Sequence, residues 1–317
     1  MKHSWLILPL LTGMAMAAPQ NPLSATAPAT ALQDPAPAPT EKPKEDPSED
    51  PDGEKKEPER LKEWPELTDK SALKEVQRLV KARTEAMGID AAEKLQAVGA
   101  PVAPLLIKEL ERARDKQAIA RIEDTLEVIT GAPHTRLLAE EFQNKSAAVR
   151  RFALYKVARL ADPGVREAAE AAYKIAAAED TKWESRDRYL TALCCASSGS
   201  LAGWADLKEL ARKKWGDYRS DLSMALPHVR SDALTAEIIA SVHSEERQDQ
   251  VDCLRLLSVA GTRTAIDYVK PLLDSGDASI RVAAINTCRG IIDGDPPLAE
   301  LSAFQAIELA KKWKDRL

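Results

Sequence analysis

Histidine and cysteine are the side chains that most often bind metals or carry out nucleophilic and acid–base chemistry. The 317-residue chain has four histidines, at His3, His134, His228 and His243. They do not form an HExxH pattern, and the chain has neither a GxSxG nucleophile motif nor a phosphate-binding Walker loop. His134 and His228 lie near expected helix ends, where an imidazole often caps backbone carbonyls. The sequence therefore predicts a protein that is not an enzyme, with no catalytic residue, no bound metal and no cofactor.

The four cysteines have neither CxxC nor zinc-site spacing. Cys194 and Cys195 are adjacent in an expected helix, where a disulfide between neighbours would distort the backbone. Cys253 and Cys288 fall in corresponding helices of the repeat described below, so a bridge between them is one interpretation. The other interpretation is that all four are small buried apolar side chains.

Aromatic residues are concentrated in one part of the chain. Five of the 14 aromatic residues lie within 36 positions: Trp183, Tyr189, Trp204, Trp215 and Tyr218. They are expected either to fill the core of an irregular unit or to form an exposed platform for a sugar or a peptide. The three tryptophans are therefore candidate binding residues.

Amphipathic helices must position these side chains. In the stretch SAAVRRFALYKVARLADPG, residues 146–164, apolar residues recur at helical spacing, at Val149, Ala153, Val157 and Leu160. Ser146 is a suitable N-cap, and the sequence Asp-Pro-Gly that follows the helix is a stop signal. No region shows the alternation of a strand, so we expect an all-α protein.

The same pattern returns along the chain. Helix ends are predicted near residues 99, 131, 162, 198, 230, 261 and 293, at intervals of roughly 31 to 36 residues. Each end is followed by a second amphipathic run, so the repeating unit is a pair of helices. The stretch DLSMALPHVR fits the pattern least well, because Pro227 interrupts it. The last run is expected to cap the array, with apolar contacts from Leu298, Leu301, Ile307 and Leu309.

Two of these units resemble the HEAT repeat. Val149-Arg150 and Ile280-Arg281 each follow an Asp or Ser N-cap, with alanine and apolar residues at fixed later offsets. The short period is similar to the HEAT-like repeats of phycobiliprotein lyases. The resemblance covers roughly residues 70–317 and implies a right-handed α-α superhelix, a solenoid of about seven helix pairs that we expect to span residues 67–317.

The resemblance also implies a role for the repeated arginine. Arg150, Arg186 and Arg281 occupy this position, where the arginine of HEAT-type repeats commonly joins an acidic residue near the turn between helices. That role is structural. A binding role would require the guanidinium groups to be exposed on one face, and the three arginines are the remaining candidate binding residues.

The first 17 residues read as a secretory signal peptide. Lys2 precedes a short apolar run, and Ala15-Met16-Ala17 is a small-x-small cleavage site. The apolar run is too short for a membrane-spanning helix, for which about 20 apolar residues are needed. We expect an exported protein, periplasmic or extracellular, with no integral membrane span after cleavage.

Residues 18–66 have the composition of a disordered linker. Eleven of the 20 prolines lie in this stretch, together with 12 acidic and 6 basic residues. The rest of the chain after residue 66 has equal numbers of acidic and basic residues, so the net charge of −5 comes from the N-terminal part. A charge-balanced repeat region lacks the basic surface expected of a nucleic-acid-binding protein.

A chain of stacked helix pairs without catalytic motifs is expected to be a binding scaffold. The leading hypothesis is a non-catalytic protein-interaction scaffold of the cell envelope or secreted space, with a protein, or a glycan, as its partner. One alternative, implied by the resemblance, is a lyase-like or other enzyme-assisting factor. The other is a structural spacer of the envelope, in which the linker separates the helical part from a surface.

Overall fold

The computed structural model describes residues 59–317, except 242–245 and 299–300, and confirms the all-α prediction. The described residues form fourteen α-helices and no strand. The predicted signal peptide and most of the predicted linker lie outside these residues. None of the described helices combines the length and the apolar character that a membrane span requires.

The α-helices are α1 (Ala72–Val80), α2 (Glu85–Val98), α3 (Ala103–Arg112), α4 (Lys116–Ile129), α5 (Thr135–Ala139), α6 (Ala147–Leu160), α7 (Arg166–Ala177), α8 (Ser185–Ser197), α9 (Trp204–Ala225), α10 (Asp232–Ala240), α11 (Arg247–Ala260), α12 (Ile266–Val269), α13 (Ala278–Cys288) and α14 (Ala303–Arg316). Short helical turns join them. These include η2 (Ala132–His134), η4 (Pro163–Val165), η5 (Leu226–Val229) and the π-turn η8 (Arg289–Asp293). The predicted helix ends are confirmed at Val98, Ile129, Leu160, Ser197, Val229, Ala260 and Asp293.

Helix α6 shows how the local sequence sets these ends. Its apolar residues Val149, Ala153 and Val157 are buried, as their spacing predicts. The helix stops because Ala161 takes the left-handed conformation, with φ 50°, before the Asp-Pro-Gly sequence. Ser146 precedes the helix, but the prediction that its side chain caps it is wrong. Its amide instead donates to the Asn144 side chain, which closes the preceding turn.

Helix α9 departs from the predicted pattern of separate helices. The run after residue 203 and the helix that precedes η5 are joined, with a kink at Lys214 (φ −144°, ψ 42°) in place of a loop. Pro227 lies in η5, after the helix, where its missing amide hydrogen leaves the α-helical ladder intact. The proline therefore ends α9 rather than breaking it.

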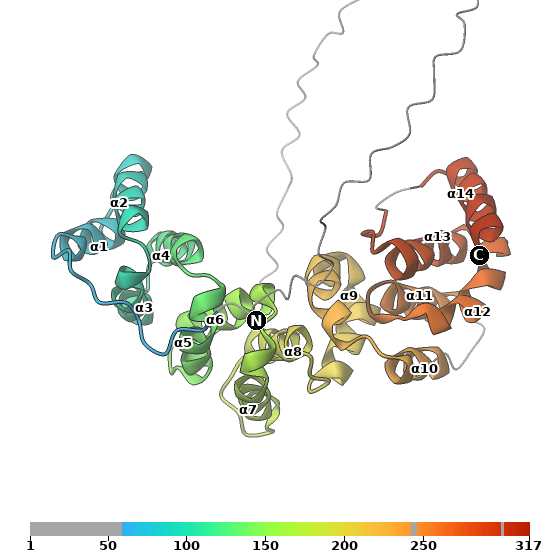
Figure 1. Cartoon of the computed structure of the whole chain (residues 1–317), viewed down its shortest axis with the longest axis horizontal. Helices are drawn as coiled ribbons and strands as arrows, with labels where there is room; N and C mark the ends of the chain where they lie inside the picture. The colour runs from blue at the N-terminus through green and yellow to red at the C-terminus, as the bar shows by residue number, and fades with distance from the viewer. Residues whose placement is uncertain (1–58, 242–245, 299–300) are drawn as a thin grey trace, which may run out of the picture. The chain divides into compact units, whose positions relative to one another are not determined.

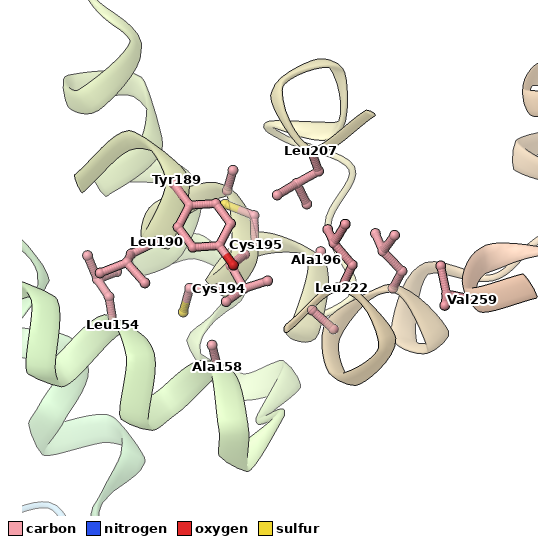
Figure 2. Packing of buried hydrophobic residues seen from close by; sticks show 14 of the residues in the cluster. Leu154, Ala158, Tyr189, Leu190, Cys194, Cys195, Ala196, Leu207, Leu222 and Val259 are labelled. Carbon is pink, nitrogen blue, oxygen red and sulfur yellow. The ribbon is translucent and has the colours of Figure 1, made fainter. Parts of the chain in front are cut away.

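Helices that pack together are close along the chain, as Figure 1 shows. Helix α6 packs on α8, α7 on α8, α8 on α9, and α11 on α13. One cluster of buried apolar side chains extends from Ala72 to Trp313. Figure 2 shows its middle, where Leu154 of α6, Leu190 and Cys194 of α8 and Leu222 of α9 come together. Each helix thus buries its apolar face against its neighbours.

Residues 59–66 are part of the folded chain, although the sequence assigns them to the linker. This N-terminal strap (residues 59–66) contacts η2 and η4. Arg60 pairs with Asp162, the Leu61 amide donates to the Pro133 carbonyl at 2.8 Å, and Trp64 stacks on His134. The folded part therefore begins before the position that composition suggests.

The C-terminal helix α14 packs on α13. It does so through Ala306, Ala310 and Trp313, which are buried. Ile307 was expected among the apolar contacts, but its side chain is 53% exposed. Small residues at a spacing of four bring the helix close, and this turns Ile307 outward.

Candidate functional site

Arg150 lies in a buried charged cluster between α6 and α8. Its Nη2 is 3.2 Å from Asp187, which is fully buried, and its guanidinium lies 4.4 Å from the centre of the Trp183 ring. Arg151 also pairs with Asp187, with its Nε 2.9 Å from Oδ1. Burial alone would raise the pKa of Asp187, but the Arg151 hydrogen bond, the Glu184 amide and both guanidinium charges hold that pKa below its usual value. The cluster is a structural joint between two helices.

Arg281 makes one of the same contacts. Its Nη1 donates to the carbonyl of Ser275 at 2.6 Å, and Arg150 donates in the same way to Asn144 at 2.8 Å. In both cases the acceptor lies six residues earlier, in the turn before the helix. The arginine therefore caps the turn that leads into its own helix, which supports the structural role that the sequence suggested.

Arg186 does not occupy the corresponding position. Arg150 and Arg281 are the fourth residues of α6 and α13, whereas Arg186 is the second residue of α8. The fourth residue of α8 is Arg188, which pairs with Asp206 at 2.6 Å. The predicted position of the arginine is two residues too early, because α8 starts at a capping box of Glu184 with Asp187. The apolar pattern of the sequence does not indicate where this helix begins. Arg186 is exposed and lines two cavities.

The three tryptophans do not gather on one exposed surface. Trp204 is buried, and its indole nitrogen donates to Glu237 at 2.8 Å. Trp183 is half-buried beneath Arg150, and Trp215 is half-buried at a cavity between α9, α11 and α13. Of the predicted aromatic cluster, Tyr189 and Tyr218 do meet, with ring centres 4.7 Å apart.

The cysteines and histidines of the described residues have structural surroundings. All four cysteines are free and buried, so Cys253 and Cys288 are not bridged. His134 accepts a hydrogen bond from the Gly131 amide through Nδ1, whereas His228 lies exposed in η5. His243 lies outside the described residues. Within the described residues, no group of three or more potential metal ligands converges.

Two adjoining cavities along α4, α6, α8 and α9 form the candidate site. The larger, about 580 Å³, is lined by Tyr155 of α6, Tyr189 of α8 and Tyr218 of α9. Asp217 and Asp221 of α9 also line it, as do Arg186 and Lys214, and we call the three tyrosines and two aspartates the tyrosine–aspartate pocket. The smaller cavity, about 270 Å³, shares Tyr155, Arg186 and Leu190 with it. The two cavities therefore adjoin, and we refer to them together as the groove.

Hydrogen bonds fix the geometry of the tyrosine–aspartate pocket. The Tyr189 hydroxyl donates to one oxygen of Asp221 at 2.6 Å, and the Tyr155 hydroxyl donates to the other at 3.2 Å. Burial and the neighbouring carboxylate raise the pKa of Tyr189 far above its usual value, so the phenol stays protonated. The pocket therefore presents a carboxylate, phenolic oxygens and ring faces, which all favour a hydrogen-bond donor or a cation.

Acidic residues also line the smaller cavity. Glu123 and Asp124 of α4 are adjacent there. Burial, and to a lesser extent repulsion from Asp124, raises the pKa of Glu123, and the charge of Arg186 partly offsets this increase. Arg159 and Lys156 pair with Glu127, at 2.7 and 3.0 Å. The groove is thus a polar surface of mixed charge.

The tyrosine–aspartate pocket was not predicted from the sequence. Tyr155 and Asp221 are 66 residues apart, so no local pattern joins them. The available signal was the pair Asp217 and Asp221, four residues apart on one helix face beside Tyr218.

A comparison with protein-family models finds no match for this chain, and a comparison with curated proteins finds none either.

Proposed function

We propose that this protein is a non-catalytic protein-interaction scaffold whose helix pairs stack as a right-handed α-α superhelix. The support for stacking is that extensive packing joins only helices that are close along the chain, over one unbroken apolar core. The period of the predicted helix ends, which the observed helices reproduce, supports the same arrangement.

The observation that carries the proposal is a series of cavities along successive helix pairs, three of which adjoin through shared lining residues. A cavity of about 710 Å³ between α2 and α4 shares Asp124 with the smaller cavity of the groove. At the other end, a cavity of about 570 Å³ is lined by α9, α11 and α13. Lining residues thus come from one helix of each successive pair, as expected for an extended surface that binds an elongated partner.

Charge supports a protein partner rather than a nucleic acid. The part of the chain after residue 66 carries equal numbers of acidic and basic residues. The groove includes acidic residues from α4 and α9, which would repel a phosphate backbone.

We also propose that the protein is exported, because of the signal-peptide pattern in residues 1–17. N-terminal sequencing of the protein recovered from the envelope or medium tests export, and a chain that still begins at Met1 would contradict it.

Site-specific photo-crosslinking in the producing cell tests the scaffold function. A p-benzoylphenylalanine at Arg186 or Lys214 places the probe in the groove, and one at Lys174, exposed on α7, is the control. We expect both groove positions to crosslink the same protein, identified by mass spectrometry, and Lys174 to crosslink none of it. No crosslinked protein at the groove, or an equal yield at Lys174, would contradict the proposal.

A further inference from the structure

We propose that the tyrosine–aspartate pocket binds an arginine or lysine side chain of the partner protein. This inference rests on the proposed scaffold function and specifies the chemistry of the surface that the partner presents. It starts from the cavity of about 580 Å³, which is large enough for a long cationic side chain.

The first argument is the direction of the hydrogen bonds. Tyr155 and Tyr189 both give their hydroxyl protons to Asp221, so their oxygens face the cavity as acceptors only. Asp221 forms no ion pair within the part of the chain that the structure describes, although Arg186 and Lys214 line the same cavity. Two neutral donors leave its full negative charge in place, and a guanidinium or ammonium group would neutralise it.

The second argument is the arrangement of the rings. Tyr189 and Tyr218 lie with centres 4.7 Å apart and an interplanar angle of 58°, and Tyr155 lines the same cavity from α6. Tilted aromatic faces next to a carboxylate form an environment that attracts a cation, since the ring quadrupole is negative over its face. An apolar ligand would form no ion pair with Asp217 or Asp221.

The third argument is the charge balance of the whole groove. Arg151 is paired with Asp187, and Lys156 and Arg159 are paired with Glu127. Four carboxylates of the groove remain outside the ion pairs of the described residues, namely Glu123, Asp124, Asp217 and Asp221. The cations that remain are Arg186 and Lys214. Five acidic and five basic side chains line the groove, so it has no net charge, and a basic partner would pair with the carboxylates that lack an ion pair.

A defined peptide probe tests the inference on the full-length protein. The probe is a fluorescein-labelled dodecapeptide of glycine and serine with three evenly spaced arginines, and its matched control carries citrulline at the same positions. Citrulline keeps the shape of arginine but has no charge. Fluorescence anisotropy is expected to show binding of the arginine peptide and at least tenfold weaker binding of the citrulline peptide.

Variants assign the binding to the pocket. Asp217→Asn and Asp221→Asn are each expected to weaken binding of the arginine peptide about tenfold. Asp217 is exposed, so its replacement leaves the fold intact even if Asp221→Asn disturbs the two tyrosines. Glu179→Gln, at an exposed turn outside the groove, removes the same charge and should change the affinity less than twofold. Thermal unfolding of each variant shows that the fold is kept.

Three results would overturn the inference. They are no binding of the arginine peptide at millimolar concentration, equal binding of the citrulline peptide, and unchanged binding by both asparagine variants. The last result would assign the affinity to acidic residues elsewhere in the chain. If groove positions still crosslink a partner in the cell, the scaffold proposal stands and only the cation specificity fails.

Discussion

Arg60 and Asp162 are 102 residues apart in the sequence and form a bidentate ion pair, with Nε 2.8 Å from one carboxylate oxygen and Nη2 2.5 Å from the other. Asp162 is buried and also accepts hydrogen bonds from the Thr135 hydroxyl and the Gly164 amide. A Cβ at Gly164 would lie 2.7 Å from the Arg60 guanidinium carbon, so a side chain at this position would make the guanidinium shift. The pair holds the N-terminal strap on the turns that follow α4 and α6.

Arg60→Ala should detach the strap. We expect a loss of about 1–2 kcal/mol in the free energy of unfolding, because Asp162 keeps its other donors. Limited proteolysis should cleave near Leu61 faster than in the native chain, and Gly164→Ala, which displaces the guanidinium, should have a smaller effect in the same direction. Lys62→Ala, exposed in the same strap, is the control. A cleavage rate unchanged in Arg60→Ala would show that Leu61 and Trp64 alone hold the strap.

Arg150→Ala should be more destabilising than Arg281→Ala. Both substitutions remove a bond to a turn carbonyl, but only the first also removes the pair with buried Asp187 and the contact with Trp183. We expect a loss of about 1–3 kcal/mol for Arg150→Ala and about 1 kcal/mol for Arg281→Ala. Denaturant unfolding of the two variants measures the difference. Equal losses of unfolding free energy would mean that Arg150 stabilises the fold only through its hydrogen bond to the turn carbonyl.

Gly290→Ala should strongly destabilise the C-terminal part of the chain. A Cβ at this position in η8 would lie 1.9 Å from the carbonyl oxygen of Ser258 in α11, so α11 and α13 could not keep their separation. We expect a cost of about 3 kcal/mol from overpacking. Gly216→Ala in α9 is the opposite case, because nothing lies within 4 Å of the added carbon. Gly216→Ala should stabilise the protein by about 0.5–1 kcal/mol, because alanine has a higher helix propensity than glycine. Melting curves of the two variants test whether one is destabilised and the other stabilised.

Acid should remove the contribution of Asp187 and Asp162 to stability. The folded-state pKa of each lies below the usual value of an aspartate, despite burial, because of the arginine and amide donors. The unfolded state therefore binds protons first, so this stability is present above about pH 4 and is lost as pH falls through the folded pKa values. Asp187→Asn should flatten the decline of the unfolding free energy between pH 5 and 2. A decline as steep as in the native chain would show that other carboxylates govern it.

The helix ends were predictable because the residues that stop a helix act locally. Gly99 with φ 79° and the Asp-Pro-Gly sequence after α6 end helices whatever the tertiary structure. The burial of Val149, Ala153 and Val157 follows equally from their spacing. For these features the sequence carries the information within one or two helical turns.

The candidate site was not predictable in the same way. Tyr155, Tyr189 and Asp221 come from three helices, and only packing brings their oxygens together. Arg186 was misplaced by two residues, because the start of α8 depends on a capping box rather than on the apolar pattern. The strap was assigned to the linker by its composition, which cannot reveal a pair between residues 102 positions apart.

The four buried cysteines allow local opening of the native chain to be measured by thiol labelling. Burial raises the pKa of Cys253 to about 12 and that of Cys288 to about 11, so neither is a thiolate in neutral solution while folded. Maleimide can therefore label a thiol only after the surrounding helix has opened. Pulsed alkylation with peptide mapping would time the opening of α8, α11 and α13 separately, in a protein with no engineered probe.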